Sequence, residues 1–132
     1  MKPESLLYAK THEWVLLAEE NGQKIATMGL TAFAVDALTD LVYIELPKVG
    51  QRVRAGESLC EVESVKAVSD VYAPATGEVI GVNSGLADDL DTLSKDPFDN
   101  GWIAKLKVTD DANLKNLLDY AAYQKQCAEE AL

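Results

Sequence analysis

Most of the chain consists of short stretches rich in apolar, β-prone residues that are separated by turn residues, and this pattern predicts β-strands. Residues 13–18 and 24–30 form two such stretches, and the turn signal Asn21-Gly22 between them predicts a hairpin. Pro and Gly divide the middle of the chain into four further short strands, expected at residues 41–46, 58–63, 67–73 and 78–82. Residues 102–108 alternate between apolar and polar or small positions, as a half-buried strand does, and are expected to close the β-unit.

Helices are expected at the few places where capping residues precede apolar residues at helical spacing. The Thr31 hydroxyl can accept a hydrogen bond from the first turn of a short helix that ends near Asp40. Thr109, Asp110 and Asp111 predict the start of a helix that continues to Leu118. Asp119 predicts the cap of a last helix.

These elements together predict a mainly β fold with a short internal helix and C-terminal helices. The length of 132 residues fits one domain over residues 1–132. Its core is expected at about residues 7–108, and its helical segment at about residues 110–130.

The formal net charge of -10 argues against nucleic-acid binding and against anionic membrane surfaces. It favours partners that present basic faces. The simplest interpretation of the acidic segment after residue 77 is a solvated loop, which contains Glu78, Asp88, Asp89, Asp91, Asp96 and Asp99.

Two cysteines and a single histidine are too few for a disulfide framework or a zinc site. No apolar run is long enough for a transmembrane helix, and residues 1–10 resemble neither a signal peptide nor a transit peptide. We therefore expect a cytoplasmic protein, or a mitochondrial one only if a transit peptide has been removed.

The segment at residues 59–73 is unusual because two short strands meet at a lysine, with neither Gly nor Pro at the junction. If Val65 and Lys66 form a two-residue turn, Glu63 lies opposite Val68 and the lysine amine projects into solvent. Such an amine is accessible to a modifying enzyme. For this turn alone, an ordinary solvated lysine remains the simpler interpretation.

The sequence around this lysine resembles the biotinyl and lipoyl carriers, which have a barrel-sandwich hybrid fold, and among them the glycine cleavage system H proteins. The resemblance extends over about residues 7–127 and includes many separate motifs. These motifs are residues 12–15, 29–31, 42–47, 50–59, 63–67, 69–70, 72–79, 82–83, 96–98 and 101–102. Departures from the family pattern are the loop at residues 90–94 and Thr39, which stands where glycine is common.

The resemblance implies a lipoyl-carrier domain with lipoic acid attached covalently to Lys66. Biotin carriers typically have methionines on both sides of the lysine, whereas this chain has Val65 and Ala67. The residues expected to be recognised by the attaching ligase or lipoyl transferase are Glu63, Ser64, Val65 and Ala67.

In such a carrier, the arm takes an aminomethyl group from a pyridoxal-phosphate glycine decarboxylase to an aminomethyltransferase. Dihydrolipoyl dehydrogenase then reoxidises the dithiol. The carrier catalyses none of these steps, so the resemblance implies a shuttle, expected to be monomeric, and no enzyme.

By the same resemblance, Thr11, Glu13 and Asp70 are candidates for a pocket that holds the loaded arm. Carboxylates could bind an ammonium group there by charge-assisted hydrogen bonds. The two-residue turn also places Glu61 opposite Asp70, which like-charge repulsion disfavours unless the register differs or a cation lies nearby. Glu13 and Asp70 could equally be plain surface acids.

Three other functions stay open: an H-like relay that donates lipoate to other enzymes, an unmodified interaction module, and a small enzyme that uses Lys66. The last is disfavoured because a catalytic lysine normally lies desolvated beside other reactive groups.

Overall fold

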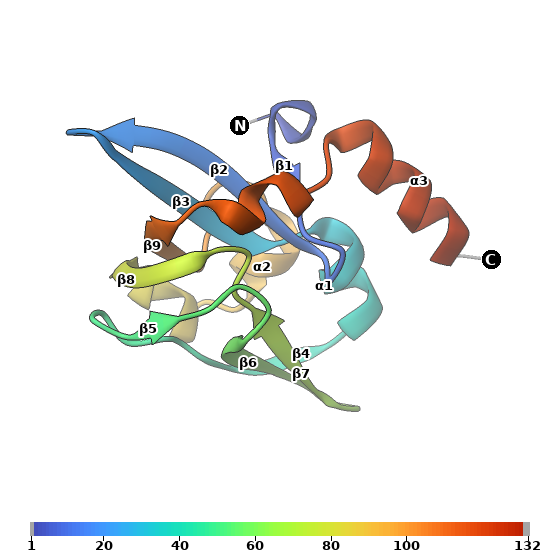
Figure 1. Cartoon of the computed structure of the whole chain (residues 1–132). Coiled ribbons are helices and arrows are strands. Elements are labelled where there is room, and N and C mark those ends of the chain that lie inside the picture. Colours follow the sequence, from blue (N-terminus) through green and yellow to red (C-terminus); the bar gives the residue numbers. More distant parts are fainter. Residues whose placement is uncertain (1, 131–132) are drawn as a thin grey trace.

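The computed structural model describes residues 2–130, and it confirms the mainly β fold (Figure 1). A six-stranded antiparallel sheet has the order β1-β2-β3-β9-β8-β5, and a three-stranded sheet has the order β4-β6-β7. The strands are β1 (Leu7–Tyr8), β2 (Glu13–Glu20), β3 (Gln23–Leu30), β4 (Leu41–Glu45), β5 (Arg52–Val53), β6 (Ser58–Ser64), β7 (Val68–Tyr72), β8 (Thr76–Val82) and β9 (Ala104–Asp110).

Helical segments are short and lie before, between and after the strands. The α-helices are α1 (Ala32–Leu38), α2 (Asp91–Lys95) and α3 (Tyr120–Glu130), and the 3-10 helices are η1 (Pro3–Ser5), η2 (Ser84–Ala87) and η3 (Ala112–Asn116). Within residues 2–130, none of the helices has the length and apolar character needed to cross a membrane.

The β2–β3 hairpin forms at the predicted turn. Glu20 pairs with Gln23, and the two turn residues, Asn21 and Gly22, both have positive φ angles of 52° and 77°. Asn and Gly are the residues that tolerate this conformation best, so the sequence at the turn fixes the register of the hairpin.

The main core contains apolar side chains from both sheets, including Val15 and Met28 from the larger sheet and Val62 and Val71 from the smaller one. A second buried cluster, made of Leu6, Tyr8, Trp14 and Tyr123, attaches α3 to the β1–β2 region. Each fully buried Val or Leu of this kind contributes about 1.5–3 kcal/mol. In the second cluster, α3 contributes Tyr123, whose ring stacks on Tyr8 with the centroids 4.3 Å apart.

The predicted helix from Thr109 to Leu118 is wrong. Thr109 and Asp110 continue β9, only Ala112–Asn116 forms a 3-10 helix, and Leu118 is extended. The reason is a pair of backbone hydrogen bonds between Tyr8 and Leu118, N–O 2.8 and 2.7 Å, which replace helical bonds. By contrast, the Asp119 cap is confirmed, since its Oδ1 accepts from the Ala122 amide at 2.8 Å.

Helix α1 begins as predicted, with Thr31 Oγ1 accepting a hydrogen bond from the Ala34 amide at 3.2 Å. It ends at Thr39, whose φ of 63° and ψ of -127° are unusual for a β-branched residue. The Thr39 hydroxyl donates to the Leu38 carbonyl at 2.6 Å. A threonine in this conformation is strained, because its Cβ crowds the backbone where glycine would not.

We expect Thr39→Gly to stabilise the protein by about 1 kcal/mol, because relief of backbone strain exceeds the added freedom of the unfolded chain. Thr39→Ala is the matched control, since it keeps the Cβ and should not stabilise. Urea denaturation of the three proteins measures the difference. Equal stability of the glycine variant and the parent would contradict a strained Thr39.

Candidate functional site

Lys66 lies at the exposed tip of the β6–β7 hairpin, which extends beyond the body of the protein (Figure 1). Glu63 pairs with Val68, so the predicted register is confirmed. The Ser64 amide donates to the Ala67 carbonyl at 2.8 Å, and the buried Ser64 hydroxyl lies 3.2 Å from both the amide and the carbonyl oxygen of Ala67. These bonds hold the turn rigid while the lysine side chain stays free to be approached.

The tip is also hydrogen-bonded to the residue that precedes β4. The Val65 amide donates to the Asp40 carbonyl at 2.9 Å. Val65 is 70% exposed, Val68 57% and Tyr43 51%. Apolar side chains gathered at the surface around one reactive group are typical of a protein-docking site.

The exposed position of Lys66 fits covalent attachment of an acyl group. A primary amine on a flexible stem can enter the active site of a modifying enzyme, and the rigid turn presents it. The exposed position does not fit a catalytic lysine, which requires desolvation.

Glu13, at the start of β2, is fully buried, with 0% of its surface exposed. Thr11 Oγ1 donates a hydrogen bond to Oε1, and the Tyr72 amide donates to Oε2 at 3.2 Å. Burial raises the pKa of this carboxyl from 4.5 to about 7, although both hydrogen bonds oppose the change. Glu13 is therefore poised to exchange a proton near neutral pH.

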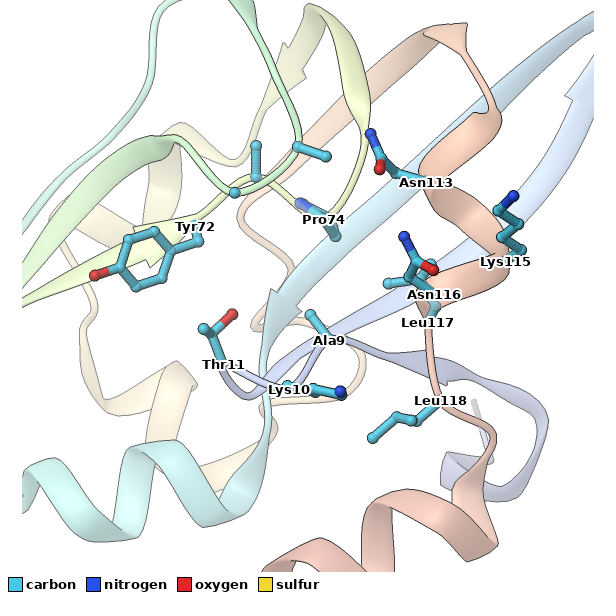
Figure 2. A pocket seen from close by; sticks show the side chains of 13 residues that line it. Ala9, Lys10, Thr11, Tyr72, Pro74, Asn113, Lys115, Asn116, Leu117 and Leu118 are labelled. Atoms are coloured by element: carbon cyan, nitrogen blue, oxygen red, sulfur yellow. The ribbon is translucent and has the colours of Figure 1, made fainter.

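A hollow of about 630 Å³ is lined by Thr11 and Tyr72, the two residues that hydrogen-bond to this carboxyl, although Glu13 itself is not part of the lining. Figure 2 shows the Thr11 and Tyr72 side chains on one side and the C-terminal segment, with Asn113 and Leu117, on the other. Tyr72 and Lys66 are six residues apart on one hairpin, which corresponds to about 20 Å of extended strand. The hollow thus begins about 20 Å along the hairpin from the lysine at its tip.

Asp70 lies on the outer face of β7 and accepts a hydrogen bond from Ser58 Oγ at 2.9 Å. It pairs with Glu61, as the two-residue turn predicts, and Glu61 also pairs with Glu45. All three carboxylates are exposed, so water screens their repulsion and no nearby cation is required. The structure thus brings Thr11 and Glu13 together and leaves Asp70 facing solvent, two residues from Tyr72.

Two contributors to the site were not predicted from the sequence. One is the backbone amide of Tyr72, and the other is the wall that residues 113 and 115–118 add to the hollow. Neither carries a sequence signal, because a backbone amide has no residue identity and the wall depends on long-range packing. No group of three or more His, Cys, Asp or Glu side chains between residues 2 and 130 is arranged to hold a metal ion.

The family model of the glycine cleavage H-protein matches residues 6–130 of this chain. The chain belongs to the glycine cleavage H-protein family. The glycine cleavage system H protein of Rhodopirellula baltica is 55% identical over 127 residues, which are 96% of each protein. That of Thermotoga maritima is 45% identical over 123 residues, which are 93% of this chain and 96% of the relative.

A solved structure leads to the same family. The crystal structure of a glycine cleavage system H protein from Mycobacterium marinum has a TM-score of 0.85 and 39% sequence identity, and the match covers 95% of this chain and 98% of that one. H proteins are lipoyl carriers of the glycine cleavage system, bear lipoate covalently on a lysine, and are not enzymes. The carrier function, the lipoyl cofactor and the barrel-sandwich fold expected from the resemblance are therefore confirmed.

Proposed function

We propose that Lys66 is the lysine that bears the lipoyl group in this carrier of the glycine cleavage system. The observation that carries the proposal is the exposed amine on a rigid turn, with strands paired up to residues 63 and 68 on either side. When bound, the lipoyl group supplies a dithiolane that can accept and release the aminomethyl group. The chain's own residues then present the arm, shelter its end and meet the partners.

The four residues around Lys66 are suited to recognition by the ligase or lipoyl transferase. Before modification, the reacting amine extends only four methylenes from the hairpin, so the enzyme must contact Glu63, Val65 and Ala67 to reach it. Ser64 contributes indirectly, since its buried hydroxyl holds the turn. Glu63 pairs with Tyr43 and with Val68, so its carboxylate lies between two exposed apolar side chains.

We expect Glu63→Gln to slow lipoylation of the unmodified protein by at least about 10-fold, the effect of losing one hydrogen bond to a charged group. Glu61→Gln, two positions further along the same strand, is the matched control and should react at the parent rate. Initial rates followed by intact mass spectrometry give the comparison. A parental rate for Glu63→Gln would contradict recognition of this carboxylate, and an equal slowing of both variants would mean that the enzyme responds to net charge alone.

Thr11, Glu13 and Asp70 are proposed to hold the loaded end of the arm. The support for Glu13 is its hydrogen bonding to Thr11 and Tyr72, which line the hollow, and its raised pKa, since an incoming ammonium group would favour the ionised carboxylate. Thr11 keeps that carboxylate oriented through its hydroxyl. Asp70 has the weaker support of an exposed carboxylate on the strand between Lys66 and Tyr72.

The proposed partners are the pyridoxal-phosphate glycine decarboxylase, the aminomethyltransferase and dihydrolipoyl dehydrogenase, along with the lipoate-attaching enzyme. The exposed row of Glu45, Glu61 and Asp70 beside the hairpin suits basic faces on these proteins, with weak contacts that allow a monomeric shuttle to leave quickly. We further propose a cytoplasmic location, supported by the free thiols of Cys60 and Cys127, which are typical of a reducing compartment.

Reconstitution with the pyridoxal-phosphate glycine decarboxylase tests this function. Exchange of labelled bicarbonate into glycine should require the lipoylated protein and should be absent with the unmodified one. Lipoylated protein that supports no exchange, yet passes lipoate to other lipoyl-dependent enzymes, would contradict the shuttle and favour the relay.

A further inference from the structure

His12 stands between Thr11 and Glu13, and its ring contacts three other side chains. Two of these three contacts are with one part of the chain, helix α3: the ring Nδ1 lies 2.7 Å from the Tyr123 hydroxyl, and the ring Nε2 lies 2.9 Å from Glu130 Oε2. The ring also stacks on Phe33 of α1, with centroids 4.7 Å apart. Only 16% of the side chain is exposed.

We infer that His12 is a positioning residue, whose ring fastens helix α3 to the Thr11–Glu13 turn and so holds the Glu13 carboxylate in its buried position beside Thr11. This inference rests on the proposed function for the role of Glu13. It gives helix α3 a role in orienting the Glu13 carboxylate, in addition to its packing in the second buried cluster.

The backbone at this turn needs such a restraint. His12 has a φ of 76°, its amide donates to the Ala9 carbonyl at 3.0 Å, and the Ala9 amide donates to the Glu13 carbonyl at 2.9 Å. A left-handed histidine costs about 1–2 kcal/mol relative to an ordinary conformation, so surrounding contacts must compensate. The ring contacts and the bond from the Thr31 amide to the His12 carbonyl, 3.1 Å, supply that compensation.

The side chains of Thr31, Tyr123, His12 and Glu130 form a hydrogen-bond network, and one arrangement of protons gives each of its groups a partner. The Ala34 amide donates to Thr31 Oγ1, which donates to the Tyr123 oxygen at 2.7 Å. The Tyr123 hydroxyl then donates to His12 Nδ1, and Nε2–H donates to Glu130. The Tyr123 hydroxyl thus joins the Thr31 cap of α1 to His12, and its burial raises the pKa of this hydroxyl.

The contacts that position Glu13 are therefore separate from those that hold the Lys66 turn. The His12 network touches the turn beside Glu13, whereas the Lys66 turn is held by its own bonds to Ala67 and Asp40. Loosening α3 should therefore admit water to Glu13 and leave attachment of the arm unchanged.

The test compares Tyr123→Phe, His12→Gly and His12→Asn in the full-length lipoylated protein, with Lys125→Ala on α3 as a control. Tyr123→Phe removes one oxygen. His12→Gly removes the ring and also relieves the strain of the left-handed backbone conformation. His12→Asn tolerates the left-handed conformation and keeps an acceptor near Nδ1. The readouts are the lipoylation rate, the pKa of Glu13 by carbon-13 NMR, and hydrolysis of the aminomethyl cargo to formaldehyde, ammonium and the free thiol.

We expect Tyr123→Phe and His12→Gly to lower the pKa of Glu13 from about 7 toward its ordinary value of 4.5. Formaldehyde release should rise about 2- to 30-fold, the range typical of altered coupling, with parental lipoylation rates. His12→Asn should recover much of the parental behaviour, and Lys125→Ala all of it.

A pKa of about 7 retained in both Tyr123→Phe and His12→Gly would overturn the inference, and the single-atom change in Tyr123→Phe keeps the test valid if the glycine variant fails to fold. Parental formaldehyde release from Glu13→Gln would instead contradict the proposed role of Glu13. The NMR titration would still decide whether His12 positions that carboxyl.

Discussion

Replacing Lys66 with arginine is expected to eliminate lipoylation and, with it, all exchange of bicarbonate into glycine. Arginine keeps the positive charge and similar length, but its guanidinium stays protonated and delocalised and cannot act as the acyl acceptor. The side chain is exposed and the turn is held by Ser64, Ala67 and Asp40, so the fold should be unaffected. The loss therefore isolates the attachment chemistry from stability.

The control for this change is Lys48→Arg, which alters another exposed lysine outside the hairpin. It should leave both lipoylation and exchange at the parental level. Residual exchange by Lys66→Arg above that of unmodified protein would mean that a second lysine carries the arm, and the proposed site would then be wrong.

Glu13→Gln is expected to change both the stability and the retention of the cargo. In the parent protein, burial raises the pKa of Glu13 from 4.5 to about 7. The folded state therefore binds this proton more tightly than the unfolded state, and the stability that Glu13 contributes below pH 4.5 is lost as the pH rises through 7. The difference between the two pKa values corresponds to at most about 3 kcal/mol.

Glutamine has no such titration, so the free energy of unfolding of Glu13→Gln should depend less steeply on pH. Relative to the parent, the variant should gain stability between pH 4.5 and 8, approaching the same limit of about 3 kcal/mol. Its amide can still accept from the Tyr72 N–H and donate to Thr11 Oγ1, so the local hydrogen bonds survive. Denaturant unfolding across this pH range measures the effect, and a parallel pH dependence would contradict a raised pKa at Glu13.

The same variant should release its cargo faster, because a neutral amide cannot pair with the ammonium group. In the parent, the ammonium should favour the ionised carboxylate, so loading should release a proton near pH 7 and retention should weaken as the pH falls below that value. Thr11→Val, which removes the hydroxyl donor and keeps the volume, should produce a smaller loss of the same kind. Formaldehyde release that is identical in all three proteins would exclude Glu13 and Thr11 from cargo binding.

The hairpin that bears Lys66 could be predicted in detail because its determinants are local. The strands alternate up to the turn, and a shift of one residue would exchange their buried and exposed faces. Val62 is fully buried while its neighbours Glu61 and Glu63 face outward, so only one register satisfies the sequence. Local residues likewise predicted the hairpin at Asn21-Gly22 and the helix caps at Thr31 and Asp119.

The proposed arm-holding residues could be named only through the resemblance, because they come from distant segments. Glu13 is on β2 of the larger sheet, while Tyr72, which donates to it, is on β7 of the smaller one. The C-terminal segment was mispredicted for a related reason: the pairing of Leu118 with Tyr8, more than a hundred positions away, overrides local helix signals. The burial that raises the pKa of Glu13 depends on such packing between distant segments, and no pattern in the sequence predicts it.

Peptide mapping of the wild-type protein, after incubation with lipoate, ATP and a lipoate ligase, tests the central claim most directly. We expect one lipoyl adduct per chain, located on Lys66 in the peptide that contains residues 63–67. An unmodified protein, or an adduct on any other lysine, would contradict it.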